Sequence, residues 1–113
     1  MGKIRTGFKV CDNRYGFRSA FSFGKEVSYE INTWTYQPHG CGPLAVFERL
    51  SDVDNFIGHN ITLMGTNETF LCEYEESREK ELYDDKGNKF TYILPHGTAL
   101  ATRVKLIKKI KNL

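Results

Sequence analysis

The sequence predicts an α+β fold, a twisted and mainly antiparallel sheet with one or two short helices, in a single domain spanning residues 1–113. A chain of 113 residues with 40% hydrophobic side chains fits one domain with a real core. Apolar residues alternate with polar ones in several short runs bounded by turn formers, which is typical of half-buried strands. One stretch, residues 50–57, has helical spacing instead. We therefore expect about six or seven strands.

The first third of the chain reads as β structure. In residues 4–10 and 17–23 the large apolar side chains fall on one face of a strand, and a glycine-containing turn ends each of these runs. Residues 27–36 continue the alternation, with a change of parity before Trp34, until Pro38 ends the run. We interpret this region as an antiparallel meander.

The middle of the chain predicts a buried strand and a helix. Residues 44–47 form a short apolar run. In residues 50–57 the apolar positions share one helical face, and Ser51 followed by Asp54 is a variant of the capping box. Gly58 supplies a C-terminal stop.

The second half returns to β structure. Residues 70–75 alternate with one polar face, and residues 79–83 and 89–93 flank a glycine-containing loop that predicts a hairpin. The basic segment near the C-terminus fits either a strand or a helix. We favour a strand because Val104, Leu106 and Ile107 have high β-propensity.

A repeated tripeptide is the most distinctive feature of the sequence. Pro38-His39-Gly40 and Pro95-His96-Gly97 both precede an apolar segment, and a Pro-x-Gly turn fixes the backbone. We expect the two rigid loops to lie side by side at one rim and to carry a binding surface. Its residues are predicted to be Trp34, His39, Cys41 and His96.

Three alternatives remain open for these residues. His39, Cys41 and His96 offer three zinc ligands, although the tight spacing of a structural zinc site is absent, so we expect no metal. Cys41 between two glycines could act as a nucleophile beside a histidine. Tyr29, Trp34 and Tyr36 could form a stacking platform for a base, but core packing is the stronger expectation for aromatic residues in a small domain.

Net charge limits the class of partner, and cysteine content indicates the cellular compartment. A net charge of +2 argues against nucleic acid as a partner, even though residues 103–113 are basic and eight of the fourteen acidic residues lie in residues 68–85. Three widely spaced cysteines, no secretion signal and no apolar run of membrane-spanning length predict a cytoplasmic protein with free thiols and no membrane contact.

One resemblance covers the chain from residue 40 onward. The segments Gly40-Cys41-Gly42-Pro43-Leu44-Ala45-Val46-Phe47 and Leu94-Pro95-His96-Gly97-Thr98-Ala99-Leu100-Ala101 resemble small uncharacterised bacterial and phage proteins. In those proteins a Gly-Pro-Leu-x-Val-Phe strand precedes a short helix, and a Pro-x-Gly-Thr loop precedes the last strand. The resemblance supports the order of elements and implies no activity.

A second resemblance rests on Glu73-Tyr74-Glu75, a Glu-x-Glu pair on the polar face of a predicted strand. It is similar to the late Glu-x-Glu of the ADP-ribosyltransferases, which bind a nicotinamide dinucleotide. The resemblance implies that Arg5 or Arg14 binds the cofactor, that Ser19 or Ser22 is the family's strand serine, and that Glu75 is catalytic. The early place of the serine departs from the family's order.

The sequence therefore favours a non-catalytic accessory module of a bacterium or phage that binds a small molecule or a partner protein without a cofactor. Whether the chain is an enzyme stays open, and so does assembly into a homo-oligomer. The alternative is an enzyme resembling the ADP-ribosyltransferases, with NAD as cofactor and Glu75 as the catalytic residue.

Overall fold

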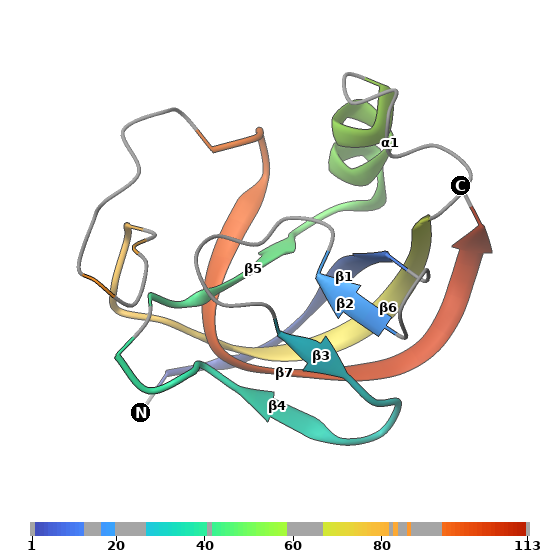
Figure 1. Cartoon of the computed structure of the whole chain (residues 1–113). Helices are drawn as coiled ribbons and strands as arrows, with labels where there is room; N and C mark the ends of the chain where they lie inside the picture. Colours follow the sequence, from blue (N-terminus) through green and yellow to red (C-terminus); the bar gives the residue numbers. More distant parts are fainter. Residues whose placement is uncertain are drawn as a thin grey trace.

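A computed structural model describes residues 2–12, 17–19, 27–40, 42–58, 67–81, 83, 86 and 94–112. Within them, seven strands form one sheet and a single short helix packs against it (Figure 1). The elements are β1 (Ile4–Asp12), β2 (Phe17–Ser19), β3 (Ser28–Tyr29), β4 (Trp34–Tyr36), β5 (Leu44–Phe47), α1 (Leu50–Gly58), β6 (Asn67–Glu76) and β7 (Thr98–Asn112). The mainly antiparallel sheet is confirmed, but with nine helical residues the α+β label is only a rough description.

Four of the strands close on themselves. β1 pairs with β6, β6 with β7, β7 with β5, and β5 returns to β1 through Phe8 and Phe47. All four pairings are antiparallel, and we call this closed circuit the ring. β7 has register shifts against β6, which let this long strand curve around the ring (Figure 1). β2, β3 and β4 extend the sheet from β1 and β7.

The alternation of side chains along the ring strands builds two separate cores. One fills the inside of the ring and is called the inner cluster; it consists of Cys11, Tyr29, Leu44, Val46, Phe70, Cys72, Tyr74, Ala101, Val104 and Leu106. The other, the helix-side cluster, joins Val10 and Phe47 on the outside of the ring to Val53 and Phe56 of α1. Burying a side chain such as Leu106, which is fully covered, contributes roughly 1.5–3 kcal/mol.

The predicted strands at residues 4–10, 44–47 and 70–75 are confirmed, and the C-terminal segment is a strand. The predicted meander is confirmed for β1, β2 and β3. The continuous run over residues 27–36 is wrong. Asn32 has a φ of 62°, its amide donates to the carbonyl of Leu106, and the chain crosses over so that β4 pairs with β7.

The helix is confirmed, but its start is displaced from the predicted cap. The amides of Asp52 and Val53 donate to the carbonyl of Arg49, so Arg49, two residues before Ser51, occupies the N-cap position of α1. The predicted hairpin over residues 79–93 lies mostly outside the described residues. No helix in the described part of the chain is long and apolar enough to cross a membrane.

Candidate ligand-binding site

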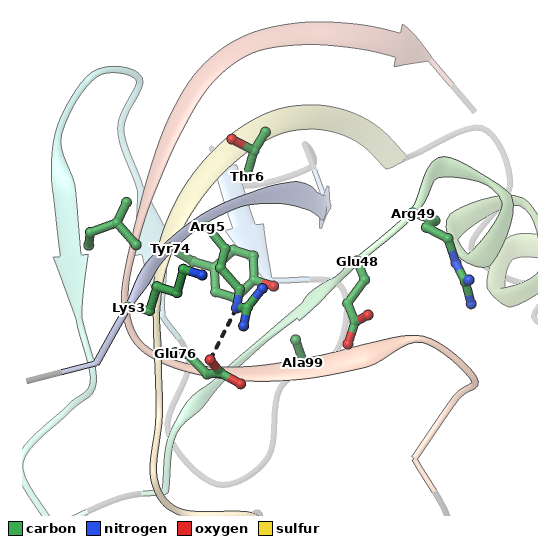
Figure 2. A pocket seen from close by; sticks show the side chains of 9 residues that line it. Lys3, Arg5, Thr6, Glu48, Arg49, Tyr74, Glu76 and Ala99 are labelled. Carbon is green, nitrogen blue, oxygen red and sulfur yellow. Dashed lines mark hydrogen bonds and ion pairs between the residues drawn. The ribbon is translucent and has the colours of Figure 1, made fainter.

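One end of the ring opens into a hollow of about 560 Å³ (Figure 2). It lies between the start of β1, the end of β6, the start of β7 and the segment that joins β5 to α1. Its lining residues are Lys3, Ile4, Arg5, Thr6, Glu48, Arg49, Tyr74, Glu76 and Ala99. Most of these side chains are charged or polar, so the hollow suits a polar ligand.

Tyr74 lines the inner side of the hollow. The residue is 2% exposed and belongs to the inner cluster, and its partner across the β1–β6 pairing is Arg5. Its ring lies close to Gly7, where an added Cβ would come within 2.8 Å of the Tyr74 ring and 2.7 Å of the Phe47 carbonyl oxygen. Glycine at position 7 therefore leaves room for the tyrosine. Burial raises the pKa of the Tyr74 hydroxyl, and the negative charge of Glu48 adds to this effect.

Arg5 and Glu76 form an ion pair beside Tyr74. The Nε of Arg5 donates to a carboxylate oxygen of Glu76 over 3.1 Å, and Figure 2 shows this contact at the edge of the hollow. The hydrogen bond lowers the pKa of Glu76 and raises that of Arg5. Both side chains are well exposed, so the pair adds little to stability. The ion pair instead positions the Arg5 guanidinium at the hollow.

Glu48 stands on the other side of Tyr74 from Lys3 (Figure 2). Its position is fixed by the backbone, because its amide donates to the carbonyl of Gly97 over 2.9 Å. The Glu48 carboxylate and the Lys3 ammonium are exposed, and neither has an ion-pair partner among the described residues.

Arg49 borders the hollow near α1 and is anchored by two neighbours. Its Nε donates to the carboxylate of Asp52 over 3.2 Å, and one of its terminal nitrogens lies 3.2 Å from Nε2 of His96. Asp52 is 2% exposed, and its carboxylate lies directly against Gly97. One buried aspartate thus fixes both Arg49 and the second Pro-His-Gly turn.

The structure separates the two histidines that the sequence predicts to be neighbours. In the antiparallel β5–β7 pairing, Leu44 lies opposite Ala101 and Phe47 opposite Thr98. His39 precedes β5 and His96 precedes β7, so the two loops lie beyond opposite ends of this pairing (Figure 1). The expectation of one shared rim is wrong, and with it a zinc ion held by both histidines. Cys41 lies outside the described residues.

Of the three predicted binding residues that the structure describes, only His96 lies beside the hollow, through its contact with Arg49. His39 is exposed in its turn. Trp34 is the first residue of β4, and its side chain lies on the outer face of the sheet. There the Arg103 guanidinium lies 4.1 Å from the centroid of the Trp34 ring. The aromatic platform is wrong for Tyr29, which is 3% exposed inside the ring.

The outer face carries the Glu-x-Glu pair. Glu73 lies 3.3 Å from Lys105, and Glu75 lies 3.6 Å from Arg103 and accepts a hydrogen bond from Thr102 over 2.7 Å. In the ADP-ribosyltransferase resemblance, Arg5 or Arg14 binds the cofactor on which Glu75 acts, so Arg5 in that role would lie near Glu75. The strand register instead places Ile4 opposite Glu75 and Arg5 opposite Tyr74, on the other face of the sheet. Of the other candidates, Ser19 is the last residue of β2 and lies opposite Cys11 in the β1–β2 pairing, whereas Arg14 and Ser22 lie outside the described residues.

A second hollow of about 520 Å³ lies between Tyr36 and the segment after β6. Two of its three acids are bound within the protein, because Glu75 contacts Thr102 and Glu79 accepts hydrogen bonds from Gln37 and Tyr83. The third, Glu76, pairs with Arg5. The first hollow keeps more of its charge available and is the better candidate site.

Comparison with known proteins adds no assignment. No protein-family model, no curated protein and no solved structure matches this chain.

Little in the sequence predicts the hollow. Lys3, Arg5, Glu48 and Tyr74 come from three separate segments, and no single motif joins them. The available signal was Gly7 within an otherwise regular strand pattern, because a glycine inside a strand marks close approach of another group. Here that group is the Tyr74 ring.

Proposed function

We propose that this protein is a non-catalytic accessory module of a bacterium or phage that binds a small charged ligand in the hollow beside Tyr74. The observation that carries this proposal is an open hollow of about 560 Å³ lined by opposite charges, those of Lys3 and Glu48, neither of which forms an ion pair with another described residue. A protein surface keeps its charges solvated or paired, and unpaired charges gathered in one concave place favour a ligand that satisfies them.

The rigidity of the site supports binding. The charged groups of the site lie at one end of the ring, near β1 and β6 and next to the Gly97 turn. The buried carboxylate of Asp52 packs against this turn. A site whose groups are already positioned loses less entropy when the ligand arrives. We also propose a reducing, cytoplasmic setting, which agrees with the buried free thiols of Cys11 and Cys72.

The transferase alternative receives less support from the structure. Its candidate catalytic carboxylate, Glu75, is 16% exposed and is engaged by Thr102 and Arg103. A catalytic glutamate needs to reach the substrate, and these contacts would first have to break.

The test is a binding screen against single-charge and double-charge small molecules, read by thermal shift and titration calorimetry. A ligand that binds only the folded state at 100 times its Kd adds about 2.7 kcal/mol to stability. The hollow variant is Lys3→Gln with Glu48→Gln. The control variant is Lys108→Gln with Glu30→Gln, which makes the same charge changes at exposed positions away from the hollow.

We expect at least one ligand class to raise Tm and to bind at least about tenfold more weakly to the hollow variant, while the control variant binds as wild type does. No shift with any compound, or equal affinity for both variants, would reject this site.

A further inference from the structure

Some charged side chains that line the hollow are bound to other residues and some are not. This difference indicates the chemical class of the ligand. Arg5 uses its Nε for Glu76, and its two terminal nitrogens have no hydrogen-bond partner among the described residues. Lys3 and Glu48 have no side-chain partner there either. Arg49, by contrast, is committed to Asp52 and His96. The hollow therefore offers donors from Arg5 and Lys3 together with one carboxylate, that of Glu48, which forms no ion pair with a described residue.

We infer that the ligand of the hollow is a small zwitterion of the amino-acid class, which carries a carboxylate and an ammonium in one molecule. The inference rests on the proposed function. It adds which chemical class binds and how its two charged groups are divided between the walls of the hollow.

The carboxylate is received by Arg5 and Lys3. A guanidinium presents parallel N–H groups that match the two oxygens of a carboxylate, and no described residue occupies the terminal nitrogens of Arg5. Its ion pair with Glu76 fixes the orientation of the guanidinium in advance. Lys3 lines the same hollow, and its positive charge, like that of Arg5, lowers the pKa of Glu76, so a second cation acts on the same region as the first.

The ammonium is received by Glu48. Figure 2 shows its side chain on the opposite side of Tyr74 from Lys3, and the backbone hydrogen bond to Gly97 fixes its position on the wall. Tyr74 lies between the two charged regions and presents its hydroxyl as a third polar group. Glu48 is close enough to Tyr74 for its charge to contribute to the raised pKa of the hydroxyl.

Ligands with a single kind of charge fit this arrangement less well. A dianion would meet Arg5 and Lys3 but would also face the Glu48 carboxylate, and like charges at such a site oppose binding. A simple amine would satisfy Glu48 and be repelled by the two cations. A zwitterion places its negative charge beside Arg5 and Lys3 and its positive charge beside Glu48, so its charges complement those of the hollow.

The experiment measures Kd by calorimetry for glycine, β-alanine, 4-aminobutyrate and 6-aminohexanoate, each compared with the carboxylate and the amine of the same carbon chain. Succinate and inorganic phosphate represent dianions. We expect at least one zwitterion to bind about tenfold or more tightly than both of its single-charge analogues. The chain length that binds best reports the separation of the two charged regions.

Single substitutions test which side of the hollow binds each charge of the zwitterion. Glu48→Gln should remove the advantage of the zwitterion over the carboxylate analogue. Lys3→Gln should reduce its advantage over the amine analogue, and Glu30→Gln and Lys108→Gln should change neither.

Succinate or phosphate binding that Lys3→Gln weakens, without any preference for a zwitterion, would overturn this inference and leave the proposed function standing. A hollow that binds no compound of either series would overturn both.

Discussion

A lysine lies buried inside the ring. Lys9 is 2% exposed, its Nζ donates to the carbonyl of Ala45 over 2.6 Å, and the ammonium lies 5.2 Å from the centroid of the Tyr29 ring. Burial lowers the pKa of Lys9 to about 8, because a charged ammonium is poorly solvated there. The same environment raises the pKa of Cys11 and of Cys72 to about 12, so both stay as thiols.

This lysine makes stability depend on pH. The unfolded chain binds the Lys9 proton up to about pH 10.5, whereas the folded chain releases it near pH 8. Between these values the unfolded state binds more protons, so stability rises with pH and the cost of the buried charge is relieved. The interval corresponds to about 3 kcal/mol. The buried cysteines act in the opposite direction above pH 9, and a comparison with Lys9→Met cancels their contribution.

We expect the free energy of unfolding of wild type, minus that of Lys9→Met, to rise by about 3 kcal/mol from pH 7.5 to 10.5. Urea unfolding of both proteins across this range measures it. A difference that stays flat would mean that Lys9 keeps its ordinary pKa in the folded protein.

At the scale of elements, the two Pro-His-Gly turns share a backbone shape but not an environment. Gly40 has a φ of 78° and Gly97 a φ of 80°, which is the left-handed conformation that glycine adopts at least cost. An added Cβ at Gly40 meets no atom of the described residues within 4 Å, whereas at Gly97 it collides with the carboxylate of Asp52. The repeat thus provides a matched pair of sites.

We predict that Gly40→Ala costs about 1 kcal/mol of stability, the usual penalty for a left-handed alanine. Gly97→Ala should cost at least about 2 kcal/mol more, because Asp52 is short, buried and held by Arg49 and cannot move away cheaply. Chemical denaturation of the two variants measures the difference. Adding Asp52→Ala to Gly97→Ala should recover part of the loss, and equal costs at both glycines would contradict the close packing.

The contrast between these turns also explains what the sequence could predict. Local patterns identified most strands, the helix and both turns, because alternation, spacing and glycine position depend on neighbouring residues. The partners of those elements depend on distant residues. Nothing near Asn32 states that β4 will leave the meander for β7, and nothing near Lys3 states that Glu48 will face it across Tyr74. The site was missed because its charges meet only when the ring closes.

At the scale of the whole molecule, the helix and the ring have separate cores. α1 is attached through the helix-side cluster, where the rings of Phe47 and Phe56 lie 5.2 Å apart between centroids. The ring is filled by the inner cluster, and strands with many long-range pairings open only with global unfolding. We therefore expect α1 to open at a lower free energy than the ring.

Hydrogen exchange tests this division and its link to function. Phe56→Ala should speed amide exchange in α1 by roughly 100-fold or more, because truncating a buried phenylalanine costs about 3–5 kcal/mol, with a smaller effect on β6 and β7. Val104→Ala, in the inner cluster, should speed exchange in both parts.

A ligand in the hollow should link the helix to the ring. Glu48 leads into α1, whereas Arg5 lies in β1 and Lys3 immediately precedes it, so a ligand that bridges them ties the helix to the ring. A saturating ligand should therefore slow exchange in α1 of wild type and lose this effect in Glu48→Gln. Uniform exchange across α1 and the ring would mean that the two cores unfold as one unit.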